Sequence, residues 1–276
     1  MSGIYVSANP GFHANIIDVA RCIKEAGFDG LFLNINEGDL SFEDVDAVRK
    51  QDLDIESLHL PYRNQQVFIN ELWADTENCI EIVSFLKKYI HLASVSGIKS
   101  VIMHVTNGYT PPPISSKGLV HFVRIADYCQ QNGVRLAIEN IKRFDYVQYL
   151  LSALRDYNVG FCFDIGHANA FTKNLYSNIW NDALENLSHV HIHDNNGIND
   201  LHLMPGMGNI DYSYIIPILK EWKPDINMTL ELYYKGREKY YDPISLDEFY
   251  HRAYLSVINC LGEGRKCHVE EKSESY

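Results

Sequence analysis

Histidine, aspartate and glutamate residues recur in this sequence at the ends of short runs rich in β-branched and other apolar residues. Such runs are typical of β-strands. The six polar residues found at or beside the last position of a run are His59, His104, Glu139, Asp164, His191 and Glu231. Imidazole and carboxylate groups without any thiolate suit zinc, manganese or cobalt, so this set favours a divalent-metal site if the strands bring it together.

Three further candidates follow these runs in loops. His167 lies three residues after the end of the sixth run, and Asp200 and His202 are separated by one residue, so both face the same way in an extended segment. His193 shares a strand face with the histidine two residues before it, and its role is left undecided. The other histidines lack this placement and are interpreted as structural or surface residues: those at positions 13, 91, 121, 189, 251 and 268.

The elements that must position these residues alternate along the chain. Short strand candidates are separated by segments of helical period, for example over 16–23, 82–93 and 246–257, which is the pattern of parallel β/α architecture. Glycines at 27, 97 and 133 each stand between a helix candidate and the next strand, where glycine is the expected helix stop. The eight strands are expected at residues 4–8, 30–35, 55–60, 100–104, 134–139, 160–164, 189–193 and 228–232.

Eight such units in 276 residues predict a single (β/α)8 TIM barrel over residues 1–261, followed by a polar tail over 262–276. In this fold the C-terminal ends of the strands surround one mouth, where active sites form. The nine candidate residues should therefore meet in one pocket. Several buried carboxylates in one mouth require cations or shared protons, because desolvation would otherwise be costly.

Composition and charge exclude several classes of function. The net charge of −12 opposes binding to nucleic acid or to an anionic membrane. No apolar run approaches the roughly 18 residues of a membrane span, and no basic-then-apolar leader precedes the first strand, so we expect a cytoplasmic protein. The six cysteines are scattered without a C-x-x-C pair, which argues against a disulfide framework or a zinc ribbon. The sequence also lacks a G-x-S-x-G elbow, a Walker loop and a dinucleotide-binding glycine motif.

Three segments resemble the xylose-isomerase-like TIM barrel superfamily, which holds sugar isomerases and epimerases together with endonuclease IV. The segments are Phe163-Asp164-Ile165-Gly166-His167-Ala168-Asn169, His191-Ile192-His193-Asp194-Asn195 and Asp200-Leu201-His202-Leu203-Met204-Pro205-Gly206-Met207-Gly208-Asn209-Ile210-Asp211. The resemblance runs from about residue 4 to residue 261 and is greatest to the group called sugar phosphate isomerase/epimerase.

This resemblance implies a metal site and roles for its residues. In the ketose epimerases of the superfamily, one metal is held by four residues, which correspond here to Glu139, Asp164, His191 and Glu231. The two glutamates of that set also exchange a proton at the carbon next to the carbonyl. Endonuclease IV adds ligands for a three-zinc cluster, which correspond here to His59, His104, His167, Asp200 and His202. The resemblance thus implies at least one divalent metal, zinc or manganese, and at most three.

The sequence departs from both kinds of relative. Ile165-Gly166 and Asn169 replace the Thr-Cys and Phe of endonuclease IV, and Leu203-Met204-Pro205 replaces its second His-Ser run. The ketose epimerases carry an arginine six residues after the metal-binding histidine, where this chain has Gly197. These departures weaken the likeness to endonuclease IV more than the likeness to the broad isomerase group.

The leading hypothesis is therefore a metal-dependent isomerase or epimerase of a sugar or sugar phosphate that works through an enediolate. Glu139, Glu231 and His167 are the predicted catalytic residues, with the two glutamates as general base and acid. The expected partner is a small sugar, with no nucleic acid and no membrane, and a homo-oligomer is compatible with the sequence.

Several alternatives stay open. The main one is phosphodiester hydrolysis at abasic DNA sites by a trinuclear zinc cluster. A sugar-binding protein that has lost catalysis is another, and so is a lyase or hydrolase acting on a glycoside. The loop over 233–241 has three interpretations as well: a cover over the substrate or a phosphate site, a solvated loop, or a subunit contact.

Overall fold

A computed structural model of the chain describes residues 2–35, 40–64 and 66–262. Eight parallel strands pair in chain order and close into a barrel, because β8 pairs with both β7 and β1. The prediction of a (β/α)8 TIM barrel is confirmed, whereas the predicted tail beyond residue 262 lies outside the described residues. The strands are β1 (Ile4–Ser7), β2 (Gly30–Asn34), β3 (Asp54–His59), β4 (Ser100–His104), β5 (Arg135–Glu139), β6 (Val159–Asp164), β7 (Leu187–Ile192) and β8 (Met228–Leu230).

Each predicted strand coincides with an observed one to within two residues at either end. The largest differences are at β7, which begins earlier than expected, and at β8, which ends at Leu230. Glu231 therefore follows its strand, although its backbone N–H still donates to the carbonyl of Ile192 on β7 at 3.0 Å. That bond keeps Glu231 in the line of the barrel wall.

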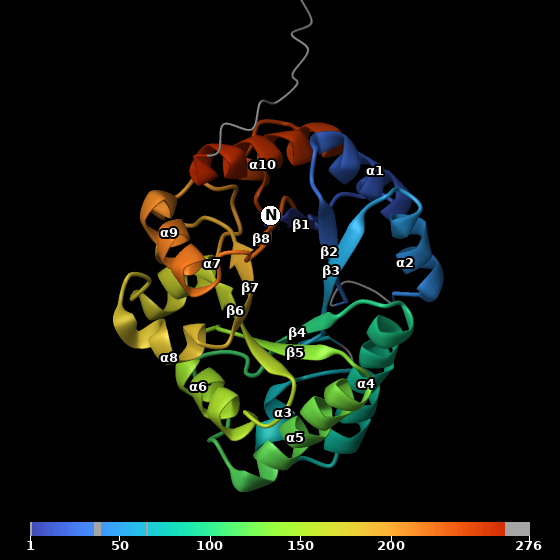
Figure 1. Cartoon of the computed structure of the whole chain (residues 1–276), viewed down its shortest axis with the longest axis vertical. Helices are drawn as coiled ribbons and strands as arrows, with labels where there is room; N and C mark the ends of the chain where they lie inside the picture. The colour runs from blue at the N-terminus through green and yellow to red at the C-terminus, as the bar shows by residue number, and fades with distance from the viewer. Residues whose placement is uncertain (1, 36–39, 65, 263–276) are drawn as a thin grey trace, which may run out of the picture.

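Helices surround the strands (Figure 1), and α10 packs against α1 to close the ring. None of the helices in the described part of the chain is long and apolar enough to cross a membrane. The helical segments are α1 (Ile16–Ala26), α2 (Phe42–Arg49), α3 (Asn70–Ala74), α4 (Cys79–Val95), α5 (Ser116–Gln131), α6 (Phe144–Ala153), α7 (Ile165–His167), a π-helical turn (Ala168–Thr172), a 3-10 turn (Asn178–Trp180), α8 (Asn181–Leu184), α9 (Tyr212–Trp222), a second 3-10 turn (Glu238–Tyr240) and α10 (Leu246–Leu261).

The glycines expected to stop helices have the predicted conformation. The φ angles at Gly27, Gly97 and Gly133 are 104°, 69° and 67°. At Gly27 the backbone N–H donates to the carbonyls of Ile23 and Lys24, so it closes the last turn of α1. A side chain would disfavour this left-handed conformation, which is why glycine ends the helix there.

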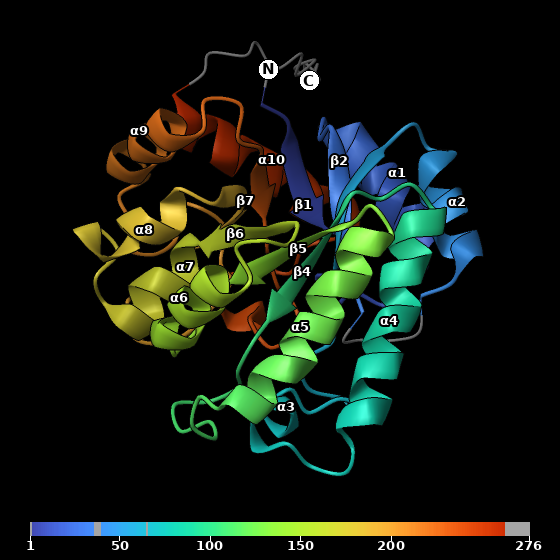
Figure 2. The ribbon, with the colours of Figure 1, turned by 60° about the horizontal axis from the view of Figure 1, so that its bottom comes forward.

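The short helix α3 anchors the chain that leaves β4. Figure 2 shows α4 and α5 side by side with α3 at one end of α5. Trp73 of α3 is buried against Phe122 and Tyr146, and its indole N–H donates to the carbonyl of Val105 at 2.7 Å. The segment after β4 is thereby tied to the outer layer of helices.

A small apolar cluster lies inside the barrel below three of the polar strand ends. Ile102, Ala137 and Cys162 form a small buried cluster separate from the large core between strands and helices. Each lies two residues before a polar residue that ends its strand, and side chains two apart in a strand face the same way. His104, Glu139 and Asp164 therefore lie directly above this apolar cluster.

Candidate metal centre

The mouth of the barrel brings all nine predicted residues together. The last residues of β3, β4, β5 and β6 are His59, His104, Glu139 and Asp164. Six of the nine line one cavity, and the other three lie beneath it in contact with them. The cavity-lining six are His59, His104, His167, Asp200, His202 and Glu231.

The first set of ligand atoms, here called the central group, comprises Glu139, Asp164, His191 and Glu231, whose donor atoms lie within 4.8 Å of one another. The Nδ1 atom of His191 is 2.8 Å from Oε1 of Glu139 and 3.2 Å from Oε2 of Glu231. Phe32 stacks on the ring of His191, with 5.0 Å between the ring centres. This packing fixes the orientation of the imidazole among the three carboxylates.

A second set, the β3–β5 group, consists of His59, His104 and Glu139. The Nε2 atoms of His59 and His104 lie 3.0 Å and 2.8 Å from Oε2 of Glu139. Glu139 therefore turns one oxygen to this group and the other to the central group. It is fully buried, with 0% of its surface exposed, so it is a bridge between two sets of ligands.

A third set, the loop group, consists of His167, His193, Asp200 and His202. Oδ2 of Asp200 lies 3.2 Å from Nε2 of His202 and 3.4 Å from Nε2 of His167. His193, which the sequence left undecided, stacks on His202 with 3.9 Å between ring centres and contacts Oδ1 of Asp200 at 3.6 Å. The structure places His193 among the candidate ligands.

A glycine makes room for this histidine. A Cβ atom at Gly166 would lie 2.0 Å from Cε1 of His193, so a side chain at residue 166 would require the ring to move. Position 166 is one of the places where the sequence departs from the endonuclease IV pattern. The absence of a side chain at Gly166 is thus what allows His193 to occupy its place.

Three residues that the sequence did not single out hold the ligands in place. Asn140 is buried beside Glu139; its side-chain NH2 donates to the carbonyl of Asp164 and its Oδ1 accepts from the Asp164 N–H, both at 2.8 Å. Asp194 accepts hydrogen bonds from backbone N–H groups of the loop over 195–210. Arg237 donates to the carbonyls of Asp200 and Leu201 at 2.9 Å and 2.8 Å. Asn140 carried one sequence signal, its position next to a strand-end glutamate, and Asp194 lies in one of the segments that carry the family resemblance.

The remaining histidines agree with the structural or surface interpretation wherever they are described. His189 lies inside the barrel below His191, where burial lowers its pKa to about 3. His121 pairs with Asp75 at 2.8 Å on the outer layer. The histidines at 13, 91 and 251 are exposed, and the one at 268 lies outside the described residues.

The electrostatics favour ionised carboxylates in the mouth. Burial alone would raise the pKa of Glu139, but the imidazoles of His191 and His104 hold it well below its usual range. Burial likewise opposes the ionisation of Glu231, yet its contacts with His191 and His202 lower its pKa. Burial lowers the pKa of His202, whereas Asp200 outweighs that effect and raises it to about 9. A divalent cation would favour the same carboxylate ionisation while displacing the imidazole protons.

The buried polar atoms of the mouth also fit a cation. Oδ2 of Asp164, Oε2 of Glu231 and Oδ1 of Asp200 are buried and form no hydrogen bond with any described residue. Their remaining contacts are ion pairs with imidazoles, as between Oε2 of Glu231 and Nδ1 of His191 at 3.2 Å, so coordination of a cation would offset more of their desolvation penalty. All three groups, as defined above, offer only carboxylate oxygen and imidazole nitrogen, which suits zinc or manganese.

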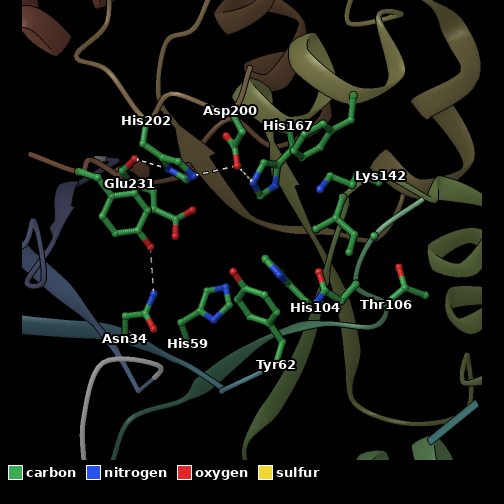
Figure 3. A pocket seen from close by; sticks show the side chains of 15 residues that line it. Asn34, His59, Tyr62, His104, Thr106, Lys142, His167, Asp200, His202 and Glu231 are labelled. Atoms are coloured by element: carbon green, nitrogen blue, oxygen red, sulfur yellow. Dashed lines mark hydrogen bonds and ion pairs between the residues drawn. The ribbon is translucent and has the colours of Figure 1, made fainter. Parts of the chain in front are cut away.

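Other side chains complete the wall of the cavity (Figure 3). Asn34, at the end of β2, donates to the hydroxyl of Tyr233 at 3.4 Å. Tyr62 packs against the ring of His104, with 4.2 Å between ring centres. Of the loop over 233–241, only Tyr233 lines the cavity, while Arg237 is used to hold the Asp200 segment.

Comparisons with known proteins agree with this architecture. An uncharacterized protein of Methanocaldococcus jannaschii is 31% identical over 147 residues, which are 49% of this chain and 47% of that protein. The chain thus spans about half the length of the curated relative it matches. A D-tagatose 3-epimerase-like protein superposes with a TM-score of 0.66 at 23% identity, over 95% of this chain and 100% of that one. A D-allulose 3-epimerase from Methylomonas sp. gives a TM-score of 0.72 at 17% identity, over 94% and 97% of the two chains.

At such identities the two solved structures establish the fold alone. The family match rests on the sequence itself, which fits the family described as xylose isomerase-like TIM barrel over residues 20–246. That range includes every strand from β2 to β8 and all nine predicted site residues. The chain belongs to the xylose isomerase-like TIM barrel family.

Proposed function

We propose that this protein is a divalent-metal-dependent isomerase or epimerase acting on a sugar or sugar phosphate. The observation that carries the proposal is the central group, in which Glu139 and Glu231 share a buried donor set with Asp164 and His191. Two carboxylates within one metal-binding set can supply the general base and the general acid for proton transfer next to a carbonyl. The likeness in fold to a D-allulose 3-epimerase and to a D-tagatose 3-epimerase-like protein is consistent with this chemistry.

Each glutamate has a defined task in this proposal. A divalent cation held by the central group would polarise the substrate carbonyl and offset the charge of the enediolate. Glu139 ends β5 and Glu231 follows β8, on different sides of the mouth, so one can accept a proton and the other can return one. Their lowered pKa values favour the ionised form that the accepting glutamate needs, so the glutamate that returns a proton must first take one up from solvent.

His167 is the third residue assigned to catalysis. Burial lowers its pKa, but the carboxylates of Asp164 and Asp200 outweigh burial and raise it well above the usual value. Its ring lines the cavity, and its Nδ1 forms a hydrogen bond of 3.0 Å with the carbonyl oxygen of Asn140. A protonated imidazole in this position can donate to a substrate oxygen, unless the loop group binds a metal and His167 serves as its ligand.

A second candidate function has a specific observation in its favour. The nine residues that correspond to the endonuclease IV ligands divide into three adjoining sets, as a trinuclear site would need. The net charge of −12 opposes DNA binding, and Gly166, which makes room for His193, departs from the endonuclease IV pattern. We therefore rank hydrolysis at abasic DNA sites below isomerisation. A cytoplasmic location stays a prediction.

The test is proton exchange in deuterated water. Metal-loaded protein should place deuterium at the carbon next to the carbonyl of a ketose substrate, detected by mass spectrometry or proton NMR. Glu139→Gln and Glu231→Gln should each lower the exchange rate by about 10²- to 10⁴-fold, the usual contribution of a general acid or base. Metal content is measured in parallel, because both residues are also assigned as ligands.

Two results would count against the proposal. A Glu231→Gln variant that keeps its metal and exchanges at the wild-type rate would remove Glu231 from proton transfer. Incision of a duplex with an abasic site, without exchange on any ketose or aldose, would favour the nuclease. The control is Glu56→Gln, the same substitution at the opposite end of the barrel, where Asn227 and Thr229 bind Glu56.

A further inference from the structure

Among the described residues that line the cavity there is one lysine and no arginine. The lysine is Lys142, three residues after Glu139 in the segment that follows β5. Figure 3 shows Lys142 on the side of the pocket away from Glu231. Its ammonium group therefore belongs to the substrate cavity, at a distance from the carboxylates that would exchange the proton.

The position of Lys142 is defined by aromatic rings. Its Nζ atom lies 5.2 Å from the centre of the Tyr109 ring and 5.0 Å from the centre of the Phe171 ring. No carboxylate of the described residues forms an ion pair with it. Phe171 in turn stacks on His167, with 5.3 Å between ring centres. Cation–π contacts thus hold the ammonium group at the mouth and leave its charge without a carboxylate partner.

A buried hydroxyl lines the same cavity. Thr106 has 0% of its surface exposed, and its Oγ1 atom forms no hydrogen bond with any described residue. A buried hydroxyl without a partner is uncommon, because it loses its hydrogen bonds to water. Thr106 appears with Lys142 on the same side of the pocket in Figure 3.

The segment that carries Thr106 is held on both sides. Asn70 of α3 exchanges two hydrogen bonds with the backbone of Asn107, at 2.7 Å and 2.8 Å. Trp73 binds the carbonyl of Val105 at 2.7 Å. The backbone on both sides of Thr106 is therefore fixed where this residue lines the cavity, which is the pre-organisation expected of a binding site.

We propose that Lys142 and Thr106 bind an anionic group of the substrate, a phosphate or a carboxylate, at the end remote from the carbon that exchanges its proton. This inference rests on the proposed function, because it assigns the far end of the same substrate. An ammonium and a hydroxyl supply donors that an anionic oxygen accepts in charge-assisted hydrogen bonds. A local cation is also needed to offset the repulsion between an anionic ligand and a chain of net charge −12.

Binding can be separated from turnover with sugar alcohols, which have no carbonyl and cannot react. The metal-loaded protein is titrated by calorimetry with a pentitol, the corresponding pentitol phosphate and the corresponding pentonate. At least one anionic ligand should bind the wild type about ten- to a hundredfold more tightly than the neutral pentitol, the range of a hydrogen bond to a charged group. The two anionic arms show whether the group is phosphate or carboxylate.

Three variants then locate the effect. Lys142→Met removes the charge but keeps an apolar stem between the two rings, and it should abolish the preference for the anion while leaving the neutral pentitol unaffected. Thr106→Val has nearly the same shape and should weaken only anion binding, by about two- to tenfold. Lys87→Met is the matched control, because Lys87 also lies over a tyrosine ring, Tyr128, but on the outer helices. Lys142→Gln replaces Lys142→Met if the latter does not fold.

The inference is overturned if neither anionic ligand is preferred by the wild type, or if the preference persists without Lys142. Exchange of deuterium into a ketose, together with no preference of the wild type for either anionic ligand, would keep the proposed function and refute the anion site. A Lys142-dependent preference for an anion, with no exchange on any sugar, would support the anion site and refute the isomerase. The two failures are therefore distinguishable.

Discussion

Replacing Glu139 by Gln should weaken metal binding at two places, whereas the same change at Glu231 should weaken it at one. Oε1 of Glu139 faces His191 at 2.8 Å, and Oε2 faces His59 at 3.0 Å. A glutamine keeps the size of the side chain but has one oxygen, so it can serve only one of the two groups and presents an NH2 to the other. Glu231 belongs to the central group alone.

The magnitude follows from the role of the carboxylate. Removing a residue that merely orients a metal ligand usually costs about 10- to 100-fold in affinity, so loss of a charged ligand should cost at least the upper end of that range. A factor of about 100 corresponds to about 2.7 kcal/mol. We expect Glu139→Gln to reduce metal affinity by at least this factor in the group that receives the NH2. Metal affinity in the other group should also fall by a measurable amount.

The assay is metal titration of the stripped protein with Zn²⁺ and Mn²⁺, combined with elemental analysis after dialysis. Glu56→Gln is the control, because Asn227 and Thr229 hold Glu56 at 2.9 Å and 2.6 Å and burial raises its pKa, so a neutral amide resembles its protonated form. If the wild type holds a single metal, and Glu139→Gln and Glu231→Gln lose it equally, the assignment of Glu139 to two groups is refuted.

Further predictions concern packing and partners. Gly118→Ala in α5 should destabilise the protein by about 1–3 kcal/mol in urea unfolding, although alanine favours helices, because the new Cβ would lie 2.9 Å from Cα of Trp73; a gain in stability would contradict this packing. Gly166→Ala should displace His193 and lower metal affinity in the loop group while the central group keeps its own, which the same titration detects. Duplex DNA should show no appreciable binding at physiological salt in a fluorescence anisotropy assay, because the net charge is −12, and tight salt-sensitive binding would reverse our ranking of the two functions.

The sequence was sufficient for the architecture because its signals are local. Strand candidates with β-branched residues, helical periods between them and glycines such as Gly27 depend only on neighbouring residues, and they predicted all eight strands. The convergence of the polar residues also followed without coordinates, since every parallel strand of a closed barrel ends at the same mouth. His104 and Glu139, 35 residues apart, are in register on adjacent strands as that rule requires.

The division of the mouth into groups was decided only by the tertiary structure. Which oxygen of Glu139 faces His191 and which faces His59 depends on the stagger of the strands and on side-chain directions, and neither has a local signal. The place of His193 depends on the missing side chain of Gly166, a contact between two strand ends.

The residues that line the cavity beside the ligands likewise could not be predicted from the sequence. Lys142 and Thr106 read as an ordinary lysine and threonine, because nothing beside them in the chain indicates an unpaired charge or a buried hydroxyl. Their environment comes from Tyr109, Phe171 and the outer helix that carries Trp73. The sequence alone determined the fold and the kinds of ligand atom at its mouth, since both follow from local pattern and strand order. How those atoms are shared and what faces them was decided by the packing of residues distant in the chain.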